Sequence, residues 1–209
     1  MKARWLVTAL LMMAAISMFA ADTSVLRPPK GARVAIVVFE DLQCPDCARA
    51  EFILKDAEKE TNVPLVRHDF PLPQHTWSFD AHVIARYLDS KSPAIGEEYR
   101  HWIFLNQPSI NKQNFRGLSE RFAEEHKVQL PENVDPTGKL AAKVKADFEL
   151  GQQLGVQHTP TIYVVSDSKL GQPFVEVVKR DQLVQMVNSM KAQVGAEKPA
   201  AKSSAEKQK

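Results

Sequence analysis

Cysteine is almost absent from this chain, which has two cysteines among its 209 residues. One disulfide cannot be the main covalent constraint on a domain of this length, so a small disulfide-rich fold is excluded. A structural zinc site needs about four Cys or His ligands, and the chain has no second cysteine pair. The two cysteines are therefore available for chemistry, with half of a metal site and a static disulfide as the alternatives.

Net charge is also nearly absent, with 27 Lys and Arg residues against 25 Asp and Glu residues. Lys2 and Arg4 lie in the N-terminal segment, and without these two the 27 basic residues become 25, equal to the acidic count. A neutral chain lacks the basic surface that attracts nucleic acid. We therefore expect no nucleic-acid partner.

A long uncharged run occurs at the N-terminus, over residues 5–21. This run is short for a membrane span, which takes roughly 20 apolar residues, and Thr8 and Ser17 interrupt it. Basic residues followed by such a run are typical of a secretory signal peptide. We predict a signal peptide over residues 1–21 and export to the periplasm, with a membrane anchor as the alternative.

The cysteines lie where a strand pattern changes to a helix pattern. Residues 34–39 form an apolar run typical of a buried strand, and apolar residues recur at helical spacing over 48–57. Cys44 is then expected near the helix N-cap, Pro45 at the first helical position and Cys47 one turn further on. Unpaired backbone N–H groups and the positive end of the helix dipole favour a thiolate on Cys44, which is a better nucleophile than the thiol.

The remaining pattern predicts a block of helices between strands. Proline-containing breaks separate the helices, and the last two strands are expected to form a hairpin around a turn that contains Gly171. The polar residues 196–209 show no apolar periodicity and predict a disordered tail. The predicted strands are 63–70, 161–165 and 174–178, and the predicted helices are 78–88, 94–105, 112–126, 139–154 and 181–194.

Four short motifs follow one another along the chain. They are Phe39-Glu40-Asp41, Cys44-Pro45-Asp46-Cys47, His68-Asp69-Phe70-Pro71-Leu72-Pro73 and Gly155-Val156-Gln157-His158-Thr159-Pro160-Thr161. Together, over residues 31–194, they resemble the DsbA-like branch of the thioredoxin superfamily. The resemblance implies an α/β thioredoxin fold with an inserted all-helical domain. It divides the chain into the signal peptide (1–21), the first part of the thioredoxin-fold domain (22–74), the helical insertion (75–154), the second part of the thioredoxin-fold domain (155–195) and the tail (196–209).

The same resemblance implies thiol-disulfide exchange with protein substrates. Cys44 is then the attacking and attacked sulfur, Cys47 the resolving thiol, and Pro160 a cis-proline whose loop packs beside the disulfide. The main chain of Thr159 would pair with an extended client segment. Independently of the resemblance, His158 lies two residues before Pro160 and is expected to be a solvated loop histidine, with an approach to Cys44 as the alternative. Exchange of this kind needs no metal and no organic cofactor.

The residues around the cysteines depart from the strongest oxidants of this family. The resemblance places Asp46 at the position where those oxidants carry histidine. We therefore expect Pro45 and Asp46, the two residues between the cysteines, to modulate the pKa of Cys44. An ionised Asp46 should raise that pKa by like-charge repulsion, which predicts a milder oxidant. The alternative is that Asp46 points to solvent and serves only the helix N-terminus.

Two further departures concern proton transfer and direction. Thioredoxin-like proteins often carry a buried carboxylate six residues before the first cysteine, and here that position is Val38. Glu40 and Asp41 are expected to be solvated loop acids, with a substitute role near Cys47 as the alternative. Thr159 resembles isomerase-type and reductase-type relatives, which leaves the direction of electron flow open.

We expect an exported, monomeric enzyme that introduces disulfides into client proteins with cysteines. A membrane redox partner would reoxidise the cysteine pair. One alternative is a periplasmic reductase or isomerase that an electron donor keeps reduced. Another, of a different class, is a thioredoxin-fold chaperone or metal-binding module, although no cluster of Met, Cys and His residues near Cys44 supports it.

Overall fold

The computed structural model describes residues 26–169 and 173–196, and it confirms the predicted order of strands and helices. Four strands form one mixed sheet in the order β2-β1-β3-β4. β1 pairs parallel with β2 and antiparallel with β3, and β4 pairs antiparallel with β3, as the predicted hairpin requires. The strands are β1 (Val34–Glu40), β2 (Leu65–Asp69), β3 (Thr161–Ser166) and β4 (Phe174–Glu176).

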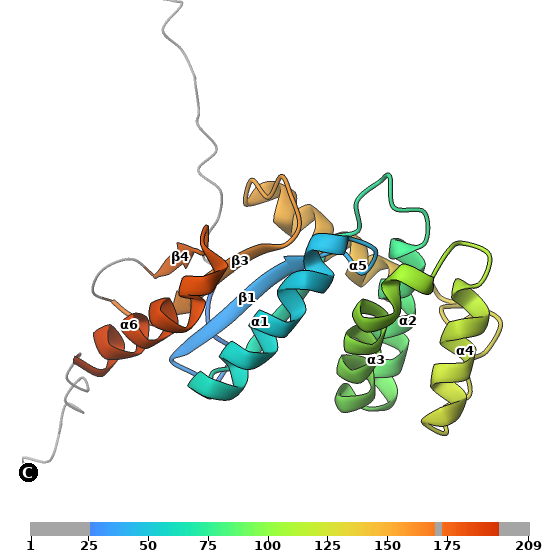
Figure 1. Cartoon of the computed structure of the whole chain (residues 1–209), viewed down its shortest axis with the longest axis horizontal. Helices are drawn as coiled ribbons and strands as arrows, with labels where there is room; N and C mark the ends of the chain where they lie inside the picture. The colour runs from blue at the N-terminus through green and yellow to red at the C-terminus, as the bar shows by residue number, and fades with distance from the viewer. Residues whose placement is uncertain (1–25, 170–172, 197–209) are drawn as a thin grey trace, which may run out of the picture.

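Six α-helices surround or extend the sheet (Figure 1). α1 and α6 lie side by side against one face of the sheet, and α2, α3 and α4 form a helical block beside it (Figure 1). α5 returns from this block and contacts β2 and α2. The helices are α1 (Pro45–Thr61), α2 (Ser78–Lys91), α3 (Pro93–Asn106), α4 (Phe115–Glu125), α5 (Lys139–Gln153) and α6 (Leu183–Ala196), with the 3₁₀ turns η2 (Gln107–Ser109) and η3 (Arg180–Gln182).

β1 is buried along its whole length because helices and loops cover both faces of the sheet. Val34, Ile36 and Val38 pack into a cluster with α1 and α6. The alternate residues, including Val37 and Phe39, pack into a second cluster on the opposite face, where α5 contributes. An unbroken apolar run is the sequence signature of a strand covered on both faces.

A third apolar cluster lies within the helical block and reaches the two cysteines. Cys44 and Cys47 belong to it together with Trp77, Tyr99 and Phe122. Trp77 stacks on Phe115 with ring centroids 5.4 Å apart, which fixes the start of α2 against the start of α4. The helical block therefore packs directly against the turn that carries the cysteines.

Several predicted elements extended beyond the observed ones; the strand predicted over 63–70, for example, spans Leu65–Asp69. The helix predicted from residue 112 begins at Phe115, because Asn111 Oδ1 accepts the backbone N–H groups of Gln113 and Asn114 in a turn before it. β4 ends at Glu176, two residues earlier than predicted, and Val178 is 86% exposed. The turn at Asn111 illustrates how a polar side chain that binds nearby backbone groups can displace the start of a helix.

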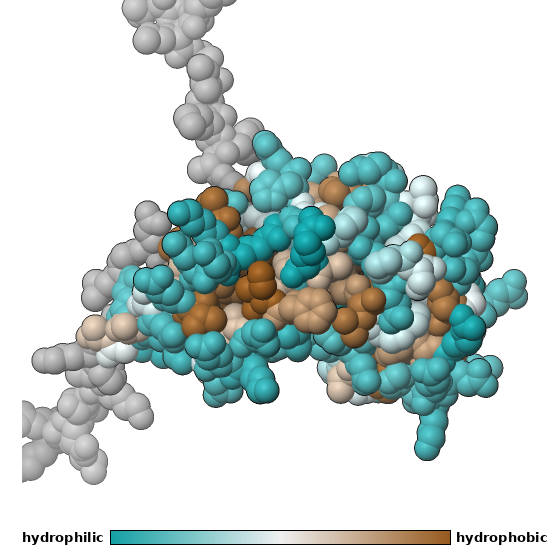
Figure 2. All heavy atoms as spheres, viewed as in Figure 1, coloured by the Kyte–Doolittle hydropathy of each residue, from teal (hydrophilic) through white to brown (hydrophobic). Residues whose placement is uncertain are grey.

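Some predictions fall outside the described residues. The signal peptide predicted over 1–21, the turn at Gly171 and the tail from residue 197 onward are among them, whereas Ala196 ends α6. Within the described ranges, no helix is both long and apolar enough to cross a bilayer. The face shown in Figure 2 is mainly hydrophilic, with apolar side chains over its middle. Phe52 of α1 and Leu105 of α3 are exposed by 55% and 50%.

Candidate active site

The two cysteines lie at the start of α1, as predicted. Cys44 is the N-cap residue with an extended backbone (φ −78°, ψ 120°), and Pro45 is the first helical residue. The Cys47 side chain lies on the first turn of the helix. Both cysteines are free thiols and are buried, with exposures of 7% for Cys44 and 2% for Cys47.

The environment of Cys44 stabilises its thiolate. Its pKa is lowered from 9.0 to about 5, chiefly because the Cys47 thiol donates a hydrogen bond to the sulfur. Burial opposes this shift, whereas the Thr159 side chain and the backbone N–H groups of Cys47 and Asp46 add to it. Backbone N–H groups at a helix start have no partner within the helix and therefore favour a negative charge.

The environment of Cys47 favours the protonated thiol. Burial is the largest cause that raises its pKa well above the usual value, and hydrogen bonding and charge at Cys44 raise it further. The backbone N–H of Asp41 lies 3.4 Å from the Cys47 sulfur and lowers the pKa in part. At neutral pH the site therefore pairs a thiolate at Cys44 with a protonated thiol at Cys47.

The loop before β3 closes the other side of the site. The Thr159–Pro160 peptide bond is cis, as the resemblance implied. The Cys44 sulfur lies 3.4 Å from the Thr159 carbonyl oxygen, to which it donates only when protonated, so this loop packs beside the reactive sulfur. The Thr159 hydroxyl is buried and makes no hydrogen bond within the described chain, so it is free to rotate toward a thiolate. His158 is exposed, and its ring lies 3.5 Å from the Thr161 hydroxyl.

The expectation for Asp46 was wrong, because its charge is not free to act on Cys44. Both terminal nitrogens of Arg180 bind the two Asp46 carboxylate oxygens, and Arg49 adds a contact of 3.0 Å. The hydrogen bonds from Arg180 are the largest cause that lowers the pKa of Asp46. The pKa of Cys44 is low, and the charge of Asp46 is not among the main causes of its shift. Arg180 is 134 residues away in sequence, and no local pattern pointed to it.

The expectation that Glu40 and Asp41 are solvated was also wrong. Glu40 is 2% exposed and Asp41 is fully buried, because the chain turns inward between β1 and α1. Asp41 accepts hydrogen bonds from the Ser78 hydroxyl (2.6 Å) and the backbone N–H of Leu72 (2.6 Å), and it pairs with His75 (2.7 Å). Asp41 thereby joins the cysteine turn to the segment that leads into α2.

Glu40 supplies a buried carboxyl near the resolving cysteine. Burial raises its pKa from 4.5 to about 7, against the opposing effect of Arg67, and the charge of Glu40 in turn raises the pKa of Cys47. One oxygen, Oε2, accepts from Arg67 Nη1 at 2.7 Å. The other oxygen, Oε1, is buried without a hydrogen-bond partner among the described residues. This burial is compatible with the alternative interpretation, a substitute for the carboxylate missing at Val38, and equally with a structural ion pair to Arg67.

The family assignment follows from a sequence comparison. A family model described as "Thioredoxin" matches residues 22–174. The chain belongs to the thioredoxin family. With its Cys44–Cys47 pair at the start of α1, this family member is a thiol-disulfide oxidoreductase. No curated protein matches it by sequence.

Solved structures confirm the predicted fold class. ScsC of Proteus mirabilis, in a transitional conformation, has a TM-score of 0.61 at 18% identity, covering 79% of this chain and 71% of that one. The thiol-disulfide exchange protein alpha-DsbA2 of Wolbachia pipientis has a TM-score of 0.62 at 16% identity, covering 78% and 85%. Oxidised BdbD of Bacillus subtilis has a TM-score of 0.62 at 20% identity, covering 80% and 91%. The likeness is one of fold, a thioredoxin-like sheet with added helices.

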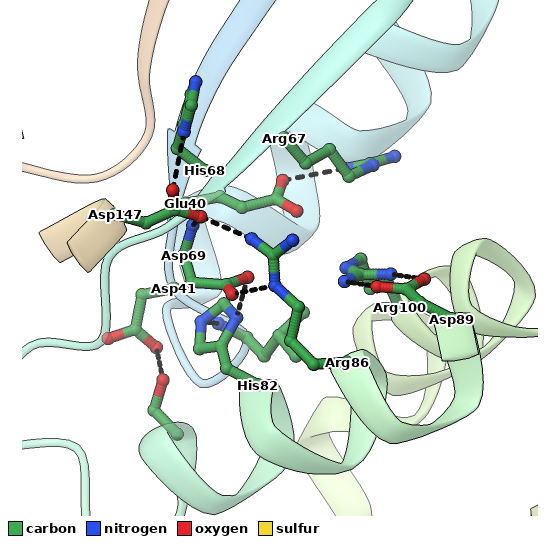
Figure 3. Close-up of polar contacts among 12 residues, drawn as sticks. Glu40, Asp41, Arg67, His68, Asp69, His82, Arg86, Asp89, Arg100 and Asp147 are labelled. Carbon is green, nitrogen blue, oxygen red and sulfur yellow. Dashed lines mark hydrogen bonds and ion pairs between the residues drawn. The ribbon is translucent and has the colours of Figure 1, made fainter. Parts of the chain in front are cut away.

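A buried ionic network underlies the site of this thioredoxin-family chain (Figure 3). Arg67, 6% exposed, lies between Glu40, Glu51 (2.9 Å) and Glu97 (2.9 Å). It therefore ties the end of β1 to α1 and α3. Burial of a charge is tolerated only where partners surround it. The Asp69 carboxylate meets His82 (2.8 Å) and Arg86 (2.6 Å) in the same region, and the pair holds the pKa of Asp69 below its usual range.

The described part of the chain offers no metal centre. None of its groups of three or more His, Cys, Asp or Glu side chains is placed to hold a metal ion. The network around Arg67 also has its carboxylates engaged by cations of the protein itself. The chemistry that the site supports is exchange at sulfur.

Proposed function

We propose that this chain is an exported disulfide donor, which oxidises pairs of cysteines in client proteins. The observation that carries the proposal is the pKa of about 5 at Cys44. A stabilised thiolate favours the reduced form of the enzyme, so the Cys44–Cys47 disulfide readily accepts electrons. Cys44 is then the sulfur that clients attack, and Cys47 is the thiol that resolves the mixed disulfide.

The exchange proceeds in two balanced steps. A client thiolate attacks the Cys44 sulfur of the disulfide, the bond to Cys47 breaks, and the Cys47 sulfur leaves with the electron pair and takes up a proton. A second client thiolate then attacks the client sulfur of the mixed disulfide and releases Cys44 as a thiolate. Two electrons pass to the enzyme, and a membrane redox partner would take them to restore the disulfide.

The loop of residues 158–160 would receive the client. Thr159 and Pro160 lie beside Cys44, so an extended client segment that pairs there presents its cysteine to the reactive sulfur. His158, exposed on the same loop, would contact the client. The proposed enzyme acts as a monomer, and its client surface is the one around Cys44.

Export to the periplasm belongs to the same proposal. The uncharged run over residues 5–21 supports removal of a signal peptide on export. A structural relative from Salmonella enterica, with a TM-score of 0.62 at 18% identity, is described as a periplasmic thioredoxin-like protein. The structural relative from Wolbachia pipientis is described as a thiol-disulfide exchange protein. An oxidising compartment is also where a disulfide donor has clients.

The second candidate function is reduction or isomerisation of client disulfides. Glu40, a buried carboxyl with a pKa of about 7, can take the proton from Cys47 in this direction, as it can return that proton in the donor direction. Attack by Cys47 on a mixed disulfide is the step that completes reduction of a client. No observation on the described residues favours the chaperone or metal-binding alternative.

The reduction potential of the Cys44–Cys47 couple separates the two directions. The protein without residues 1–21 would be equilibrated with glutathione buffers and its thiols trapped and counted. A potential of about −120 to −180 mV is expected for a disulfide donor. A potential near about −270 mV would overturn the proposal and leave a reductase. The redox state of the cysteines in cells, oxidised for a donor, is the second measurement.

A further inference from the structure

A bidentate ion pair connects the cysteine turn to the far end of the chain. Asp46 lies between the two cysteines in sequence, and Arg180 lies in η3, between β4 and α6. Nη1 of Arg180 contacts Asp46 Oδ1 at 2.9 Å, and Nη2 contacts the other oxygen. A guanidinium that binds a carboxylate through two nitrogens is held in one orientation, unlike a single-point contact.

The pair is partly shielded from water. The side chains of Arg180 and Asp46 are 28% and 36% exposed, whereas Arg49, the second cation on Asp46, is 69% exposed. Charges on Cys47 and Cys44 both raise the pKa of Arg180, after the larger effect of Asp46. Arg180 is therefore within electrostatic reach of both sulfurs, while Arg49 acts mainly as a solvated surface charge.

Other charged groups lie around the cysteine turn, on α1 itself and on neighbouring segments. On α1 these are Asp46 and Arg49, and from the loop before β3 His158 is exposed to solvent. On the inner side, Glu40 and Asp41 lie at the end of β1, next to Cys47 rather than Cys44. Asp41 is engaged by His75, Ser78 and two backbone N–H groups. Asp46 is the acidic residue in the first turn of α1, the turn that follows Cys44, and Arg180 binds its carboxylate.

We propose that Arg180 is a positioning residue for the exchange reaction, which neutralises Asp46 and so protects the Cys44 thiolate from like-charge repulsion. Without Arg180, the same carboxylate would act as the repulsive charge that its position in the sequence indicates. The aspartate between the cysteines is thus compatible with a stabilised thiolate only because η3 returns to the start of α1. The proposal rests on exchange at Cys44 but not on its direction.

The test compares four variants of the protein without residues 1–21, in which the charges of Arg180 and Asp46 are removed singly, removed together, or conserved. Arg180→Gln leaves Asp46 unpaired and should raise the pKa of Cys44 by about half a unit to one unit, a range typical of a nearby charge. Asp46→Asn removes the repulsive group and should leave that pKa unchanged or lower it. The double variant should return toward the parent, and Arg180→Lys should restore most of the effect of the charge. Thiolate absorbance against pH reports the pKa.

The glutathione equilibrium gives a second readout. At neutral pH, a pKa rise of this size in Arg180→Gln should shift the equilibrium constant toward the oxidised enzyme by about threefold to tenfold, since the reduced form loses thiolate stabilisation. Arg49→Gln is the matched control, because it removes the exposed cation from the same carboxylate and should shift the constant less. Far-ultraviolet circular dichroism and urea unfolding would show that each variant folds.

Three outcomes would overturn the inference. They are an unchanged Cys44 pKa in Arg180→Gln, a shift of the same sign in Arg180→Gln and Asp46→Asn, and an equal effect of Arg49→Gln. A same-sign shift would indicate lost packing in place of lost charge compensation. The potential of the parent protein decides the direction of electron flow, and the differences between variants decide the role of Arg180. Failure of one proposal is therefore distinguishable from failure of the other.

Discussion

Glu40 accepts a hydrogen bond from Arg67 with one oxygen, at 2.7 Å, and keeps its other oxygen buried and unpartnered within the described chain. Glu40 ends β1, and Arg67 lies in the paired strand β2, opposite Val38. Arg67 favours the ionised carboxylate, but burial outweighs it and raises the pKa of Glu40 to about 7. A carboxyl with this pKa can both take and return a proton at neutral pH.

Glu40→Gln should slow the attack of Cys47 on a mixed disulfide by about tenfold or more, because a positioned base contributes at least that much to proton transfer. Rapid mixing of the protein with a peptide joined to Cys44 through a disulfide would measure the step. Glu97→Gln is the control, since Glu97 also binds Arg67 but is 36% exposed. Equal slowing in both variants would assign the effect to Arg67 and its packing.

Glu40 should also make stability depend on pH. Its pKa is 4.5 ordinarily and about 7 in the folded protein, so between these values the folded state keeps a proton that the unfolded chain has released. Stability must then fall as pH rises through this window, by on the order of 1 kcal/mol per pH unit from this group. Urea unfolding of the parent protein and Glu40→Gln at several pH values isolates the effect as a difference. A constant difference across the window would contradict it.

Cys47 should control the pKa of Cys44 through its hydrogen bond. The Cys47 thiol is the largest cause of the shift to about 5, so Cys47→Ala should raise the pKa of Cys44, whereas Cys47→Ser keeps a donor and should raise it less. The rate of Cys44 alkylation against pH measures this. In the parent protein the rate should reach half its maximum near pH 5 and stay constant above it, because the thiolate is the reacting form. Identical profiles for the two variants would rule out the hydrogen bond as the cause.

Thr159→Val should raise the pKa of Cys44 and should cost stability only where Cys44 is ionised, by the amount that the pKa shift itself implies. The buried Thr159 hydroxyl has no geometric partner among the described residues, so its removal loses no protein hydrogen bond, yet the pKa of Cys44 should rise by about half a unit. Thr161→Val gives the matched control, because the Thr161 hydroxyl donates to the His158 carbonyl at 2.7 Å. That variant should lose about 1 kcal/mol of stability and leave the Cys44 pKa unchanged. A reversed outcome would show that Thr159 is structural.

Asp41→Asn should destabilise the cysteine turn and the segment before α2 together. Asp41 is fully buried and pairs with His75 and Ser78 besides two backbone N–H groups. Breaking a buried charged network of this kind costs about 3 kcal/mol or more. Ser78→Ala removes one hydrogen bond of the same network and should cost about 1 kcal/mol. Urea unfolding compares the two, and equal small losses would show that the network contributes little.

Local patterns in the sequence determined the elements and the position of the cysteines. The apolar run that became β1 predicts a strand covered on both faces, and Pro45 after Cys44 predicts a helix start at the cysteine turn. These features depend on the spacing of neighbouring residues, which a single sequence contains. Boundaries such as the start of α4 were displaced because side chains like Asn111 bind the backbone near them.

Only the tertiary structure decided the electrostatics of the site. Glu40 ends the apolar strand β1 and Asp41 follows it, a place where solvated acids also occur, and both side chains are buried in the fold. Arg180 reached Asp46 from 134 residues away. The pKa of an ionisable group depends on which charges and donors surround it in space and on how far water is excluded. Sequence spacing contains neither quantity, so the chain by itself determined which sulfurs react, and the fold decided their ionisation.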